Sequence, residues 1–256
     1  SYETDWPFGY DDWRQAGYAY NFGIPGSDTH KWMRVIEPLS IFDSDYDFAF
    51  DSLAPATRSA MRALYTNMDV IVIMVGGNDV NFQYGDLYDA TLGDPFSINF
   101  KNSVIANLTD LIDEVRDHNP TVPIILANIP DLSASPDIII DHPDPIKRAN
   151  ASDIVNDLNT AIAVLAASRG LTLAPISNLT DQLLSPDALY IGAHLMIKDA
   201  DPEEDNRPHY MFCWKGLHPS TNGQAIIANV MIDAINTATG NAIEKLPNRE
   251  ILTDLL

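Results

Sequence analysis

The segment Gly76-Gly77-Asn78-Asp79 has the residue types of a loop that could stabilise a negatively charged oxygen. It follows a run of β-branched residues, and its glycines would let the backbone turn sharply and approach a ligand. The side-chain amide of Asn78 is a neutral hydrogen-bond donor, which is what an oxyanion requires. An isolated Gly-Gly-Asn-Asp sequence is also typical of an ordinary turn. Asn78 therefore needs partners before it can be assigned a role.

Two other loops could supply such partners. Gly26 lies in a loop between residues 22 and 29, where its backbone N–H could face the same oxygen. That loop could also simply lead into a helix capped by the Ser-Asp-Thr run after the glycine. His218 stands directly before Pro219, and proline disfavours helical backbone in the preceding residue. His218 could therefore act as a general base from an extended loop, or it could be a surface or capping histidine.

No common motif identifies a nucleophile. The chain begins with Ser1-Tyr2, and no Gly-x-Ser-x-Gly sequence occurs in it. His142, His194 and His209 are not at a recognisable metal-ligand spacing, and no His-Glu-x-x-His sequence occurs. Cys213 is the single cysteine, which excludes a disulfide framework and a multi-thiolate metal site.

Hydrophobic patterning predicts the elements that must position these loops. Continuous apolar runs over 69–77 and 122–130 are typical of strands buried on both faces of a parallel sheet. Shorter strands are expected at 18–21 and 171–174. Between and around the strands, apolar residues repeat with the 3.6-residue period of helices. These predicted helices cover residues 55–67, 100–118, 150–168 and 222–237, the third closing with Arg169-Gly170.

Strands that alternate with helices over the whole length predict one α/β domain with a mainly parallel sheet. In such a sheet, ligands bind outside the carboxyl ends of the strands. The loops after residues 21, 75 and 130 are therefore the expected place for a functional site.

Composition excludes several classes of protein. The chain has 256 residues, 36 of them acidic and 15 basic, and a formal net charge of -21. This balance argues against a nucleic-acid binder, which needs a basic surface to neutralise phosphates, and against electrostatic docking on an anionic membrane. No run reaches the about 18 apolar residues that indicate a transmembrane helix. The polar first residues predict no signal peptide in this chain, although one could have been removed.

Taken together, the loops resemble the sequence blocks of the SGNH, or GDSL, hydrolase superfamily. Residues 21–29 are similar to the block with the oxyanion-hole glycine, Gly76 to Asp79 to the block with the asparagine donor, and Leu217-His218-Pro219 to the block with the base. Asn128-Ile129-Pro130-Asp131 also has a counterpart in many members. The resemblance covers essentially the whole chain. It implies a single three-layer α/β/α domain over residues 1–256, with a flavodoxin-like, mainly parallel sheet.

The family's serine follows Gly-Asp at the end of the first strand of the sheet, and Ser1-Tyr2 matches what comes next. The resemblance then implies that Ser1 is the nucleophile and that the first strand is missing from this sequence. An upstream segment or a partner would supply that strand, because its loss exposes strand edges. The alternative is that Ser1 is not the nucleophile.

Lys215 is a departure from the family pattern. The residue three positions before the base is an aspartate in the family, and here it is Lys215. In a triad that acid fixes the tautomer of the imidazole and stabilises the imidazolium, and a lysine side chain cannot do so. Three alternatives follow: a Ser-His dyad that uses the Lys215 carbonyl, an atypical triad with Asp201 or Asp205, or a degenerate site.

The resemblance implies a serine esterase or lipase that cleaves carboxylic esters through an acyl-enzyme. Ser1 and His218 would be catalytic, Gly26 and Asn78 would form the oxyanion hole, and no metal or cofactor would be needed. The substrate would be a lipid ester, an acetylated sugar or a short-chain ester, and the protein would be secreted, extracellular or periplasmic. The alternative function is that of a catalytically degenerate SGNH-fold protein with a binding or assembly role.

Overall fold

The computed structural model describes residues 20–24, 26–52, 54–203, 207 and 209–252. Its described residues form two compact units. The first unit contains the part up to residue 69 together with residues 103–122, and the second contains residues 70–102 and the part from residue 123 onwards. A single domain over residues 1–256 stays a prediction.

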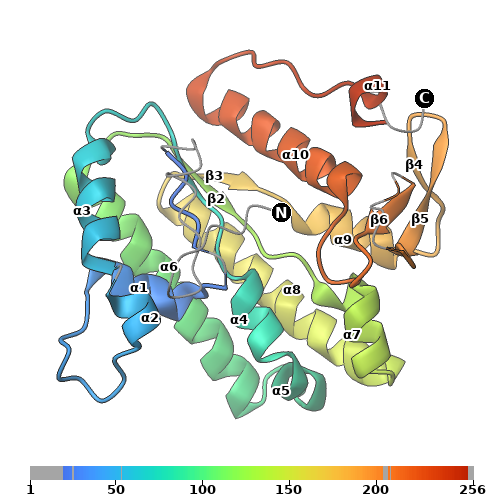
Figure 1. The fold of residues 1–256 in the computed structure, drawn as a ribbon, viewed down its shortest axis with the longest axis horizontal. Coiled ribbons are helices and arrows are strands. Elements are labelled where there is room, and N and C mark those ends of the chain that lie inside the picture. Colours follow the sequence, from blue (N-terminus) through green and yellow to red (C-terminus); the bar gives the residue numbers. More distant parts are fainter. Residues whose placement is uncertain (1–19, 25, 53, 204–206, 208, 253–256) are drawn as a thin grey trace. The chain divides into compact units, whose positions relative to one another are not determined.

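A parallel sheet forms the centre of the second unit (Figure 1). Strands β1 (Ile71–Ile73), β2 (Ile124–Ala127) and β3 (Thr172–Ala174) pair in the order β1-β2-β3. Both pairings are parallel, with Ile71 opposite Ile124 and Ile125 opposite Thr172. The sheet confirms the predicted α/β fold class and the three strands expected after residue 69. Among the described residues β1 is an edge strand, so a further strand beside it stays a prediction.

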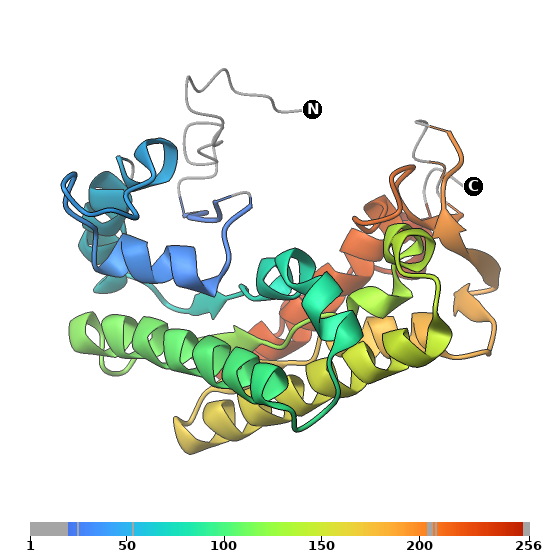
Figure 2. The ribbon, with the colours of Figure 1, turned by 90° about the horizontal axis from the view of Figure 1, so that it is seen from below.

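Helices cover both faces of this sheet. α6 (Pro95–His118) connects β1 with β2, and α8 (Pro145–Ser168) connects β2 with β3. α10 (Thr221–Thr239) packs its Ala234 against Ile125 and Ala127 of β2. Alternate strand residues point to opposite faces of the sheet, and α8 covers the face opposite α10. Figure 1 shows α8 on the side away from α10, and Figure 2 shows the same arrangement from below.

Local signals explain where the long helices begin and end. α8 begins at Pro145, and the carboxylate of Asp144 accepts a hydrogen bond of 2.9 Å from the N–H of Ile146. It ends before Gly170, whose φ of 64° confirms the predicted glycine stop. In the part of the chain that the structure describes, no helix is both long and apolar enough to cross a membrane.

Shorter elements connect the strands and carry the loops. In the second unit these are α4 (Gly77–Phe82), α5 (Tyr84–Asp89), the 3-10 helix η1 (Leu132–Ala134), α7 (Pro136–Asp141), α9 (Ser177–Leu184) and α11 (Asn248–Ile251). η1 and α7 follow one another closely in the segment after β2, and they therefore lie at the carboxyl end of the sheet.

Sequence patterning did not predict a second, small sheet. β4 (Leu189–Ile191) and β5 (His194–Ala200) form an antiparallel hairpin, and β6 (Tyr210–Phe212) pairs parallel to β5. The hairpin turns at Gly192-Ala193, and Gly192 has a φ of 60°. A two-residue connection with glycine between apolar runs is a hairpin signal, and it was the feature that could have predicted this sheet.

The first unit is helical among its described residues. It contains α1 (Thr29–Ile36), α2 (Phe48–Asp51), α3 (Ala54–Tyr65) and the C-terminal part of α6. The guanidinium of Arg62 on α3 donates two hydrogen bonds, of 2.7 and 2.8 Å, to the carboxylate of Glu114 on α6. This bidentate pair ties the two helices together.

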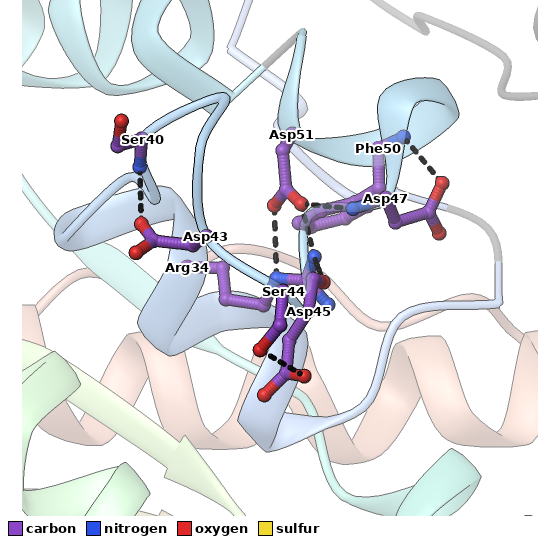
Figure 3. A network of polar contacts seen from close by, with 8 residues as sticks. All are labelled: Arg34, Ser40, Asp43, Ser44, Asp45, Asp47, Phe50 and Asp51. Carbon is purple, nitrogen blue, oxygen red and sulfur yellow. Dashed lines mark hydrogen bonds and ion pairs between the residues drawn. The ribbon is translucent and has the colours of Figure 1, made fainter.

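A buried ion pair fixes the loop between α1 and α2 (Figure 3). Arg34 donates to both carboxylate oxygens of Asp51, and the Asp51 side chain is fully buried. Arg34 also donates to the carbonyl of Asp45 at 2.7 Å, and the N–H of Asp47 donates to Asp51 at 2.6 Å. Arg34 therefore compensates the charge of Asp51, and its bond to the Asp45 carbonyl holds the loop in place.

The strand predicted at residues 18–21 is wrong for the residues that the structure describes. Tyr20 lies in a turn and Asn21 is irregular, while residues 18 and 19 lie outside the described part. The side chain of Asn21 accepts a hydrogen bond of 2.9 Å from the N–H of Gly23. Such local bonding by asparagine competes with strand pairing, and the sequence pattern does not reveal which will win.

Candidate active site

Asn78 lies at the carboxyl end of β1, in the first turn of α4. The chain turns at Gly76, which has φ 122° and ψ -18°, and α4 begins at the next residue. Asn78 is half-buried and Asp79 beside it is buried. The structure thus confirms a strand followed by a glycine turn at this position, and it adds a helix start that was not predicted. Asn78 therefore lies at the carboxyl end of the parallel sheet.

Gly76 is needed at this turn for two reasons. Its φ is positive, in a region that other residues rarely adopt. A Cβ atom on Gly76 would also lie 2.5 Å from Cδ1 and 2.8 Å from Cγ1 of Ile129. Ile129 is only 1% exposed and follows β2 directly. The turn that carries Asn78 is therefore packed against the loop after β2.

Replacing Gly76 with alanine should lower the free energy of unfolding by about 2 kcal/mol or more, because backbone strain and overpacking add. Urea unfolding followed by circular dichroism measures this change. Gly77→Ala is the matched control, since no atom lies within 4 Å of a Cβ built there. We expect the control to change stability by less than about 1 kcal/mol. Equal effects of the two substitutions would contradict the packing argument.

His218 lies in a compact turn between β6 and α10. The N–H of Gly216 donates to the carbonyl of Cys213 at 2.7 Å, and the N–H of Cys213 donates to the carbonyl of His218 at 3.0 Å. Ser220, two residues later, caps α10 through a bond from the N–H of Gly223. The His218 side chain is exposed. His218 therefore stands immediately before a helix start, as the sequence predicted.

The elements that carry Asn78 and His218 are linked through the segment after β2. α4 packs against η1 in the second unit. Ser135, directly after η1, donates a hydrogen bond of 2.5 Å to the carbonyl of Gly216, two residues before His218. The loops after β1 and β2 and the His218 turn are thus joined by contacts at the carboxyl end of one sheet, where ligands of open α/β sheets bind.

No carboxylate in the described part of the chain forms an ion pair with His218. Asp201 is fully buried, and its carboxylate accepts bonds from the Arg207 guanidinium at 2.9 and 2.6 Å and from the Glu203 N–H at 3.1 Å. Asp205 lies outside the described residues. Lys215 is exposed, and its Nζ lies 5.2 Å from the centroid of the Trp214 ring.

Asp201 is a charged group that acts on Cys213, in the His218 turn. Hydrogen bonds from Arg207 lower the pKa of Asp201 to about 2, against the opposing effect of burial. Burial, and then the negative charge of Asp201, raise the pKa of the Cys213 thiol. Asp201 is therefore a buried, charged group that binds Arg207 and the Glu203 N–H.

The lowered pKa of Asp201 predicts an acid-sensitive contribution to stability. A carboxyl whose pKa falls on folding stabilises the protein above its unfolded pKa, near 4, and this is lost as pH falls from about 4 towards 2. Asp201→Asn should therefore lower the melting temperature at pH 7, and the gap to the parent protein should narrow below about pH 4. The exposed Asp187, changed to asparagine, serves as control. If the difference in melting temperature between Asp201→Asn and the parent protein stayed constant between pH 7 and pH 3, the predicted contribution of Asp201 would be contradicted.

The structure does not test Gly26 or Ser1 as partners of Asn78 and His218. Gly26 belongs to the first unit, is exposed and has a φ of 72°. It precedes α1, where Asp28 is the N-cap and accepts a bond of 2.7 Å from the N–H of Lys31. The alternative of a loop leading into a capped helix is therefore confirmed, and an oxyanion-hole role for Gly26 stays a prediction. Ser1 lies outside the described residues, so its role as nucleophile also stays a prediction.

The sequence placed Asn128 in a segment with a family counterpart, but it did not predict the buried polar contacts behind the strand ends. Asn128, at the end of β2, donates to Ser177 Oγ at 2.8 Å and accepts from the Ser177 N–H at 2.9 Å. Asn159 of α8 bonds both backbone groups of Ile129 at 2.8 Å. The available signal was a cluster of small polar residues directly after a buried strand. Over the described ranges, no group of three or more His, Cys, Asp or Glu side chains could hold a metal ion.

The chain matches a known protein family over most of its length. Residues 3–226 match the sequence model of the GDSL-like Lipase/Acylhydrolase family. This range contains Gly26, Asn78 and His218 and begins after Ser1. A search of curated proteins found no match.

Proposed function

Because the chain belongs to the GDSL-like lipase/acylhydrolase family, we propose that it hydrolyses carboxylic esters through a covalent acyl-enzyme. Membership of the family implies an esterase-type hydrolase. The observation that supports a working site is local: the loops of Asn78 and His218 are joined through η1 and Ser135 at the carboxyl end of the sheet. The remaining parts of the mechanism follow from the chemistry of ester cleavage.

In the proposed reaction, Ser1 Oγ attacks the ester carbonyl while His218 accepts the hydroxyl proton. The oxyanion that forms is stabilised by the Asn78 amide and by the backbone N–H groups of Gly26 and Ser1. The intermediate collapses, and His218 returns the proton to the leaving alcohol. A water molecule then attacks the acyl-enzyme by the same route and regenerates Ser1.

We propose that His218 works without a side-chain acid at position 215. Lys215 cannot accept a hydrogen bond from the imidazole, and its ammonium group lies over Trp214. Asp201 is already bonded by Arg207. A backbone carbonyl, for which Lys215 is the candidate, would then orient the imidazole in a Ser-His dyad.

The substrate class is an ester with an acyl group of undetermined length, so lipid esters, acetylated sugars and short-chain esters are all candidates. We also propose a secreted, extracellular or periplasmic location, which the net charge of -21 suits without requiring it.

The proposal is tested with p-nitrophenyl esters from acetate to palmitate, using the parent protein, Ser1→Ala and the exposed-serine control Ser44→Ala. We expect hydrolysis by the parent and the control and its loss in Ser1→Ala. A fluorophosphonate probe, located by peptide mass spectrometry, should label Ser1 alone. Hydrolysis that persists in Ser1→Ala would contradict the assignment of the nucleophile.

Lys215 is the specific observation that favours a second function. A protein of this fold with a degenerate site would bind a ligand or a partner without cleaving an ester. In that case no ester in the series is hydrolysed and the fluorophosphonate labels no serine.

A further inference from the structure

The turn that carries His218 has a fixed internal shape. Its bonds run from Gly216 N–H to the Cys213 carbonyl and from Cys213 N–H to the His218 carbonyl. At its base, the N–H of Ser220 donates to the carbonyl of Met211 at 2.9 Å. These bonds hold the turn to itself and to β6. They do not determine where the turn lies relative to the strand ends of the parallel sheet.

The Gly216 carbonyl makes a contact that helps to do so, in addition to the packing of α10 on the parallel sheet. It accepts the bond of 2.5 Å from Ser135 Oγ, and the N–H of Asp137 approaches it at 3.5 Å. Ser135 is 1% exposed, so this hydroxyl has no access to water as an alternative partner. A buried hydroxyl that loses its acceptor is costly, which favours a single position for the turn.

Packing around Gly216 supports the same conclusion. Gly216 has a φ of 75°. A Cβ atom on it would lie 3.0 Å from the N atom of Asp137, 3.0 Å from Cβ of Pro136 and 3.3 Å from Cβ of Ala200. The backbone at Gly216 is therefore enclosed between the start of α7 and the end of β5, and the Ser135 bond is made inside that enclosure.

We infer that Ser135 is a positioning residue that holds the His218 turn at the carboxyl end of the sheet through the Gly216 carbonyl. This inference rests on the proposed function, in which His218 is the general base. Ser135 follows η1, and η1 packs against α4, the helix of Asn78. Ser135 therefore holds the base, while the neighbouring η1 only contacts the helix of the oxyanion donor, which the Gly76 turn places. Proton transfer needs the base within hydrogen-bond reach, so releasing the turn should slow catalysis.

Ser133 provides a matched control. It is a buried serine two residues earlier, and its hydroxyl bonds Tyr84 Oη at 2.7 Å and the Arg148 carbonyl at 3.3 Å. Ser133→Ala therefore removes a buried hydroxyl from the same segment without touching the His218 turn. Both variants are assayed at a temperature where circular dichroism shows them to be folded.

For Ser135→Ala we expect kcat on a p-nitrophenyl ester to fall about 10-fold to 100-fold, while KM changes less than about 2-fold. Ser133→Ala should lower the melting temperature but leave kcat within about 2-fold. A kcat in Ser135→Ala equal to that of the parent, or an equal loss in both variants, would overturn the inference.

If the parent protein cleaves no ester, the proposed function fails and the inference is decided by nuclear magnetic resonance. The His218 Cε1–Hε1 signal should then shift in Ser135→Ala and stay in place in Ser133→Ala. An unchanged signal in Ser135→Ala would overturn the inference that Ser135 positions the His218 turn, whatever the activity.

Discussion

Replacing His218 with alanine should lower kcat for ester hydrolysis on the order of 10⁴-fold or more, because the serine hydroxyl then has no base to accept its proton. KM should change little, since the imidazole contributes mainly in the transition state. The exposed position of His218 on a surface turn means that the substitution should leave the melting temperature within a few degrees of the parent. Steady-state kinetics and thermal unfolding measure the two quantities.

His194→Ala is the control for this prediction. His194 lies at the start of β5, and nothing assigns it a catalytic role. It should retain the activity of the parent. If His218→Ala also retained activity, a different base would have to be sought and the dyad would be wrong.

The buried pair of Arg34 and Asp51 should dominate the stability of the first unit. Asp51→Asn should lower its free energy of unfolding by about 3–5 kcal/mol, because Arg34 would keep a charge without a partner in a largely buried site. The side chains of Arg34 and Asp51 are 13% and 0% exposed. Urea unfolding gives the free energy, and hydrogen exchange of the α1 and α3 amides assigns it to this unit.

Asp43→Asn is the matched control in the same loop. Asp43 is exposed and accepts a bond of 2.6 Å from the N–H of Ser40 (Figure 3). We expect it to cost about 1 kcal/mol or less. The double variant Arg34→Met with Asp51→Leu should be more stable than Asp51→Asn alone, since no charge is then left unpaired. If Asp51→Asn lowered the free energy of unfolding by less than about 1 kcal/mol, the pair of Arg34 and Asp51 would not be needed for the stability of the first unit.

Regular hydrophobic patterns predicted the main framework. β1, β2 and β3 lie within the apolar runs that indicated strands, and α8 and α10 extend the predicted helices by only a few residues. These predictions were correct because a strand or helix that packs in or on a sheet must repeat apolar residues at its own period. The strand expected at residues 18–21 was short, and the local bond of the Asn21 side chain to Gly23 outweighed its pattern.

The candidate site was predicted only in part. The loops of Asn78 and His218 were identified from a glycine turn after a strand and from a His-Pro pair, both of which are local features. Asp201 was considered as an acid for His218, yet the fold pairs it with Arg207. Arg207 is only six positions from Asp201, but no regular hydrophobic pattern indicates which group a buried aspartate binds.

The sequence by itself determined the three strands of the parallel sheet and the helices α3, α6, α8 and α10. It also determined the loops after β1 and β2 at the carboxyl edge of that sheet, and the lysine three positions before His218. Each of these depends on residues close together in the chain. Only the tertiary structure decided that Gly76 must pack against Ile129 and that Ser135 bonds the Gly216 carbonyl. These contacts join residues tens of positions apart, and burial selects them because a polar group enclosed by the fold must find a partner there.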